Sequence, residues 1–227
     1  MRYAISGSVM QSLEIELTQG EAMFTESGGM SWMTDGIEME TNTRGGLMSG
    51  LGRALAGESL FMTTYSCSTP TAMITFTPEA PGKVLPVQLA PNQILIAQKD
   101  AFMCAQNTVK IEMHFRKRLG AGLFGGEGFI LQKLTGPGMV FLEIPGEVKE
   151  YNLAAGQRLK VDPGHIAAFD PTLNYDIAMV KGLKNIVFGG EGLFLATLTG
   201  PGRVWLQTMP IANLARKLMQ YMPTKSS

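Results

Sequence analysis

The fold is decided by the stretch FGGEGFILQKLTGPGMVFL (residues 124–142), because much of it returns 64 residues later as FGGEGLFLATLTGPGRVWL (residues 188–206). The FGGEG element, the TGPG element and the apolar triplet that follows keep the same spacing in both copies. Repetition at a fixed period is typical of chains built from repeated structural units. The sequence therefore predicts at least two copies of one unit.

A third, more diverged copy is predicted upstream. An Ile-x-Met motif occurs three times, at residues 37–39, 111–113 and, with Ala in the middle, 177–179. We predict a single domain of three fused units, at about residues 3–80, 81–146 and 147–212. Their cores must depend on one another, because units this short bury little apolar surface alone.

Short alternating runs bounded by Gly and Pro predict strands within each unit. Residues 111–115 (IEMHF) alternate apolar and polar side chains, and residues 136–138 (GPG) combine the residue types that favour tight turns. We therefore predict an all-β fold of internally triplicated β-sandwich or rolled-sheet units.

Two segments have helical rather than strand periodicity. Apolar residues recur every four positions in residues 46–56, which predicts a short helical insertion near 44–56. Residues 211–222 form a clearer amphipathic pattern directly after Pro210, which predicts a C-terminal helix. We expect both helices to pack against the β-core.

The segment 46–61, the two FGGEG elements and residues 198–208 (LTGPGRVWLQT) resemble the AIM-type mitochondrial biogenesis family. The resemblance covers about residues 1–222. It implies a fold similar to three fused copies of the tryptophan RNA-binding attenuator subunit. It supplies no catalytic residues and no cofactor.

Composition narrows the classes of function. Among 227 residues, 45% are hydrophobic and 17% charged, which excludes intrinsic disorder. Lys plus Arg and Asp plus Glu both number 19, so the whole surface is not built to hold nucleic acid. The start of the chain has no run typical of a signal peptide, and no window is apolar enough to span a membrane. We expect a cytoplasmic protein.

Basic residues end or follow the Ile-x-Met segments. They are Arg44, Arg116, Lys117, Arg118, Lys181 and Lys184. Together they could form a positive rim for RNA or an anionic lipid surface. Solvated turn residues are the alternative, and we favour it because Phe115 is the only aromatic residue beside them for stacking on RNA bases.

Glu58, Glu127 and Glu191 take equivalent places in the three units. Three carboxylates could hold a cation if the units close around an axis. We favour instead that each accepts backbone N–H groups at a glycine turn. Residues 120–125 (GAGLFG) match G-x-G-x-x-G, but a strand rather than a helix is predicted after them, so tight turns explain the glycines better than a nucleotide.

Catalytic chemistry has little support in the remaining residues. His114 and His165 are the only histidines, and neither has a nucleophile at a recognisable spacing. Cys67 and Cys104 are too few for a disulfide framework, and a buried structural thiol is predicted for Cys104. A cupin-like enzyme would need a cluster of histidine ligands. We predict no enzyme and no cofactor or metal.

The function that these patterns favour is a non-enzymatic binding or scaffold protein, assembling with itself or with a partner protein. The 16 methionines of the chain are suited to adaptable apolar contacts with a partner. The alternative is binding of an anionic ligand, RNA or lipid, through the basic connections.

Overall fold

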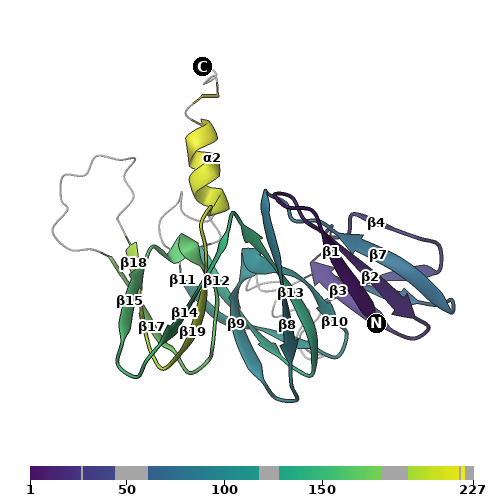
Figure 1. Cartoon of the computed structure of the whole chain (residues 1–227), viewed down its shortest axis with the longest axis horizontal. Helices are drawn as coiled ribbons and strands as arrows, with labels where there is room; N and C mark the ends of the chain where they lie inside the picture. Colours follow the sequence, from purple (N-terminus) through teal and green to yellow (C-terminus); the bar gives the residue numbers. More distant parts are fainter. Residues whose placement is uncertain (27, 44–60, 118–127, 180–193, 220, 223–227) are drawn as a thin grey trace.

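The computed structural model describes residues 1–26, 28–43, 61–117, 128–179, 194–219 and 221–222, and in these ranges the chain is mostly antiparallel β-sheet (Figure 1). The prediction of an all-β chain is confirmed. The predicted helix near 44–56 lies outside the described residues. The C-terminal helix is present as α2 (Ile211–Met219). It begins directly after Pro210, as predicted, but Tyr221 and Met222 lie beyond its end rather than within it. Within the described ranges, no helix is both long and apolar enough to cross a membrane.

The strands form four sheets that follow one another along the long axis of the molecule (Figure 1). Sheet 1 has the order β1 (Arg2–Ser6), β2 (Ser12–Thr18), β7 (Thr71–Phe76), β4 (Trp32–Met33). Sheet 2 has the order β5 (Ile37–Thr43), β6 (Phe61–Cys67), β3 (Ala22–Glu26), β10 (Phe102–Gln106), β13 (Gly138–Pro145), β8 (Gly82–Leu89). Sheet 3 has the order β11 (Lys110–Lys117), β12 (Phe129–Thr135), β9 (Ile94–Gln98), β16 (Ile166–Phe169), β19 (Gly202–Gln207), β14 (Val148–Leu153). Sheet 4 has the order β15 (Arg158–Val161), β18 (Phe194–Thr199), β17 (Asn174–Met179).

The strand order follows a period of six strands. Adding six to each strand number of sheet 2 gives the strand order of sheet 3, so that β5, β6 and β3 correspond to β11, β12 and β9. Sheet 4 continues this pattern with β17, β18 and β15. The boundaries of the three predicted units, and the likeness to the attenuator subunit, stay predictions.

Three apolar layers fill the spaces between the four sheets. The layer between sheets 1 and 2 includes Ile15 and Phe76 from one side and Phe141 from the other. The next two layers lie between sheets 2 and 3 and between sheets 3 and 4. Sheets 2 and 3 are therefore covered on both faces.

Strand β13 shows how this double burial shapes the sequence. Met139 and Phe141 face the layer toward sheet 1, whereas Val140, Leu142 and Ile144 face the layer toward sheet 3. A strand covered on both faces is apolar at nearly every position rather than at alternate ones. This is why residues 138–145 (GMVFLEIP) contain a single charged residue, Glu143.

The turn between β12 and β13 has the chemistry that the sequence predicts. Gly138 adopts a φ of +142°, and a Cβ built there would lie 2.7 Å from the Thr108 hydroxyl oxygen. Gly202 adopts a φ of +146° at the equivalent place before β19. Both backbone conformation and close approach therefore require glycine here.

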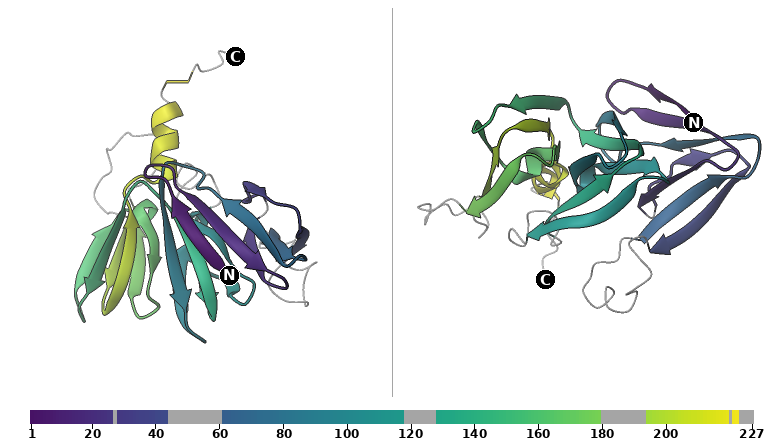
Figure 2. Two further views of the ribbon diagram at one scale, coloured as in Figure 1. Left: turned by 45° about the vertical axis from the view of Figure 1, so that its right-hand side comes forward. Right: turned by 90° about the horizontal axis from the view of Figure 1, so that it is seen from below.

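The expectation that the C-terminal helix packs against the β-core is wrong. No residue of α2 is buried, and the helix projects away from the sheets (Figures 1 and 2). Residues 212–214 are half-buried near the body, whereas residues 215–219 are all exposed. The amphipathic pattern indicates that one face of the helix packs against an apolar surface. The β-sheets pack against one another and do not supply that surface.

Candidate functional site

The predicted basic residues fall at the ends of β11 and β17 and in neighbouring segments. Arg44, Arg118, Lys181 and Lys184 lie outside the described residues, and only the backbone of Arg116 is described. The ammonium group of Lys117 donates a hydrogen bond to the backbone carbonyl of Ile177. Lys117 thus links the edge strands of sheets 3 and 4. Anion binding by this set of residues stays a prediction.

The predicted cation site and the glycine motif cannot be placed in the structure either. Glu58, Glu127 and Glu191, and the glycine motif at 120–125, lie outside the described residues, so the cation hypothesis stays a prediction. In the part of the chain that the structure describes, no three His, Cys, Asp or Glu side chains are grouped so as to hold a metal ion.

The histidines and cysteines take part in internal contacts. His165 Nδ1 donates to the Gln207 carbonyl over 2.8 Å. The His114 ring lies against Tyr175, and partial burial together with Lys133 lowers the His114 pKa. Both thiols are buried, as predicted for Cys104, whose pKa burial raises well above its ordinary value.

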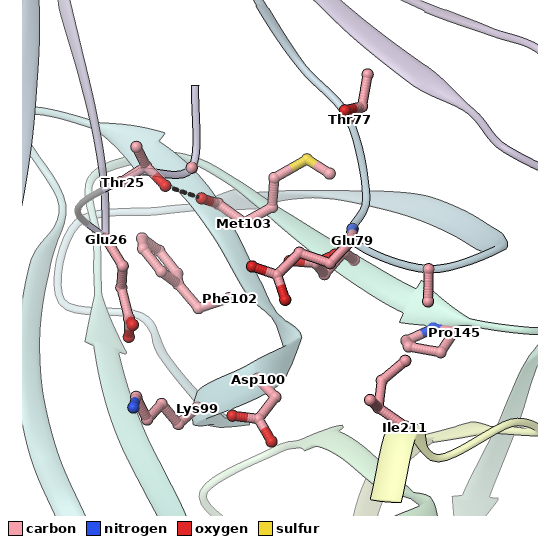
Figure 3. A pocket seen from close by; sticks show the side chains of 13 residues that line it. Thr25, Glu26, Thr77, Glu79, Lys99, Asp100, Phe102, Met103, Pro145 and Ile211 are labelled. Atoms are coloured by element: carbon pink, nitrogen blue, oxygen red, sulfur yellow. Dashed lines mark hydrogen bonds between the residues drawn. The ribbon is translucent and has the colours of Figure 1, made fainter. Parts of the chain in front are cut away.

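A cavity of about 280 Å³, which the sequence analysis missed, opens where sheet 2 meets the start of α2 (Figure 3). Four carboxyl groups and one amine line it, together with apolar side chains that include Phe102 and Ile211. The charged residues are Glu26, Glu79, Lys99, Asp100 and Glu143. They come from the end of β3, the segment before β8, the 3₁₀ turn η1 (Lys99–Ala101) and β13. Such a lining favours a proton or a cation over an anion.

Glu143 is the most perturbed group of the cavity. Its burial raises its pKa to about 7, and the nearby Glu79, Asp100 and Glu26 carboxylates act in the same direction. The backbone N–H of Glu79 donates to Glu143 Oε2 over 2.8 Å, which opposes the rise. At neutral pH the Glu143 carboxyl group is therefore close to half protonated.

Buried amides hold two of the other carboxylates in place. Gln98 Nε2 donates to Asp100 Oδ2 over 2.9 Å, and Gln132 Nε2 donates to Glu26 Oε1 over 3.3 Å. The four acids are far apart in the sequence, so no spacing motif marks them. The one available signal was a carboxylate, Glu143, within an otherwise apolar strand.

A second feature is the set of exposed apolar side chains on α2, on the two residues 221–222 beyond its end, and on the turn between β1 and β2. We call this set the α2 edge, and its members are Val9, Met10, Ile211, Leu218, Met219, Tyr221 and Met222. Figures 1 and 2 both place the β1–β2 turn near the base of α2.

A chain of backbone hydrogen bonds connects the two parts of the α2 edge. Gly82 donates to the Val9 carbonyl over 2.7 Å, Gly146 donates to Pro81 over 2.8 Å, and Met209 donates to Pro145 over 3.2 Å. The beginning of β8 and the end of β13 therefore join the Val9–Met10 turn to the residues just before α2.

Comparisons with known proteins agree with this fold. A crystal structure of a Streptococcus pyogenes protein matches with a TM-score of 0.77 and 24% identity, over 97% of this chain and 99% of that one. An uncharacterised Streptococcus pyogenes protein is 28% identical over 236 residues, which span 100% of this chain and 93% of that protein.

A fungal relative carries a more informative description. The altered inheritance of mitochondria protein 24 of Verticillium alfalfae is 23% identical over 176 residues, which span 76% of this chain but only 44% of that protein. The family model described as mitochondrial biogenesis AIM24 matches residues 3–209, up to the segment just before α2. Since that match spans most of the sequence, the chain belongs to the AIM24 mitochondrial biogenesis family.

Proposed function

We propose that this member of the AIM24 family is a non-enzymatic binding protein that attaches to its partner through the apolar side of α2. The observation that carries the proposal is the exposure of large apolar side chains on the second half of this helix and directly after it. Leu218, Met219, Tyr221 and Met222 are between 56% and 75% exposed. Large apolar side chains gathered on one exposed segment mark an interaction site more often than a free surface.

Helix stability supports the same proposal. An isolated helix shorter than roughly 12–15 residues is marginal in water, and most helical stability in proteins comes from packing an apolar face. Only the first turn of α2 lies against the body, and Ile211 lines the cavity there. A partner that covers Leu218 and Met219 would therefore stabilise the helix and bury the apolar surface.

The chemistry of the described side chains is consistent with a non-enzymatic role. His165 is engaged with a backbone carbonyl, and the two thiols are buried away from solvent. Sustained turnover of ester, phosphate or glycoside substrates by the purified protein would contradict this part of the proposal.

Attachment through α2 can be tested without knowing the partner. A photo-reactive phenylalanine derivative at Leu218 should form adducts in cells of the source organism, whether with protein, lipid or another copy of the chain. The matched control is the same derivative at Tyr151, an exposed aromatic residue of β14 outside the α2 edge. Absence of adducts at Leu218 and at Met222, in protein that folds normally, would contradict the proposal.

A further inference from the structure

We infer that the surface bound by α2 is an anionic membrane, with the apolar half of the helix and the Val9–Met10 turn in contact with the lipid. This inference rests on the proposed function and names its partner class. The family match ends at residue 209, just before α2.

The helix has an apolar side too wide for a simple helix pair. At 3.6 residues per turn, the apolar residues of α2 cover about half of its circumference, and Asn213, Arg216 and Lys217 occupy the other half. A coiled-coil seam is narrower and extends over several heptads, whereas α2 has nine residues. A helix from a second copy would leave much of this apolar side in water, whereas a lipid surface covers all of the part that the body leaves exposed.

The charges of the C-terminal segment complement an anionic surface. Residues 208–227 contain Arg216, Lys217 and Lys225 and no Asp or Glu, although the whole chain has a formal net charge of zero. Among the described residues, neither Arg216 nor Lys217 has a carboxylate within ion-pairing distance. Arg216 contacts Asn213 and Lys217 lies over the Tyr221 ring. Two such helices would repel one another, whereas anionic lipid attracts both cations.

The Val9–Met10 turn supplies a second apolar point at the base of the helix. Val9 is 67% and Met10 60% exposed, although a turn in water is usually polar. Lys83 and Glu147 beside it form an ion pair with 3.4 Å between Nζ and Oε1. Their charges cancel, so this ion pair adds no net charge beside the turn. Nucleic acid would match the cations but would leave the apolar side chains uncovered.

The test is co-sedimentation of the purified full chain with lipid vesicles. We expect binding to vesicles of phosphatidylcholine mixed with phosphatidylserine, and much weaker binding to phosphatidylcholine alone. Leu218→Asn should lower the partition coefficient at least about tenfold, because a buried leucine contributes strongly to apolar transfer. Arg216→Gln combined with Lys217→Gln should lower it roughly tenfold or more on the anionic vesicles only. High salt should lower binding to the anionic vesicles in the same way as the double variant does.

The matched control is Tyr151→Asn, which removes an exposed aromatic side chain away from the α2 edge and should leave binding unchanged. Thermal unfolding of each variant establishes that the β-layers are intact, which is expected because Leu218 is exposed. Val9→Ser combined with Met10→Ser should weaken vesicle binding without altering the helix.

Each other outcome overturns the inference in a different way. No binding of the wild-type chain to either vesicle rejects the membrane, while a protein adduct at Leu218 leaves the proposed function standing. A dimer that Leu218→Asn dissociates identifies a second copy as the partner. Binding of single-stranded RNA that depends on Arg216 and Lys217 but not on Leu218 identifies nucleic acid instead. If Leu218→Asn leaves vesicle binding unchanged, the contact with lipid lies outside α2.

Discussion

Replacing Glu143 by Gln should change how the stability of the protein depends on pH. The Glu143 side chain is largely buried beside three other carboxylates, and its pKa is raised to about 7 from an ordinary value of 4.5. Glutamine has nearly the same shape and stays neutral at every pH. Its amide oxygen can still accept the 2.8 Å hydrogen bond from the Glu79 N–H.

The direction of the effect follows from proton binding. Between pH 4.5 and 7 the folded protein holds a proton on Glu143 that the unfolded chain has released, so the free energy of unfolding falls as pH rises. The stabilising contribution of protonated Glu143 is complete below pH 4.5 and is lost as pH passes through 7. At about 1.36 kcal/mol per pH unit, the loss is roughly 3 kcal/mol. Glu143→Gln should avoid this loss and be more stable than the wild type at pH 8.

The assay is urea unfolding of both proteins at several pH values from 5 to 8. The difference in free energy of unfolding, variant minus wild type, should rise across this range, by up to about 3 kcal/mol. Glu147→Gln is the matched control, because it makes the same substitution at a glutamate whose side chain is 68% exposed and lies outside the cavity. A difference for Glu143→Gln that stays constant from pH 5 to 8 would refute the reasoning.

Four other predictions concern the core and its turns. Gly138→Ala should destabilise the protein by about 2–4 kcal/mol, from strain and overlap together. Gly156→Ala, with a φ of +76° but open space around it, should cost only about 1 kcal/mol in the same urea assay. Phe141→Ala should cost about 3–5 kcal/mol in thermal unfolding, since Phe141 is fully buried, and a loss under 1 kcal/mol would contradict its place in the core. Cys67 and Cys104 should react with a thiol reagent only in denaturant, and rapid labelling of the native protein would show that the thiols are accessible.

Local patterns in the sequence predicted local structure well. The GPG turns join strands and use glycine at positive φ, and the C-terminal helix begins directly after Pro210. These features depend on residues within a few positions of one another, so their chemistry can be recognised without knowing the fold.

Patterns that depend on distant residues were harder to interpret. The run of apolar residues in β13 predicted a strand, but it could not show that Phe141 and Leu142 face different layers. The cavity escaped notice because Glu26, Glu79 and Asp100 share no motif. For α2 the sequence correctly predicted an apolar face, but the prediction that the β-core covers this face was wrong.

The sequence by itself determined the all-β character, the tight turns and the amphipathic C-terminal helix, because backbone preference and side-chain periodicity act within a few residues. The tertiary structure decided which strands of distant segments pair, as β3 does with β10 and β9 with β16. It also decided that four carboxylates meet at one cavity and that the second half of α2 stays exposed. These outcomes depend on how three apolar layers pack together, and packing joins residues whose separation along the chain carries no signal.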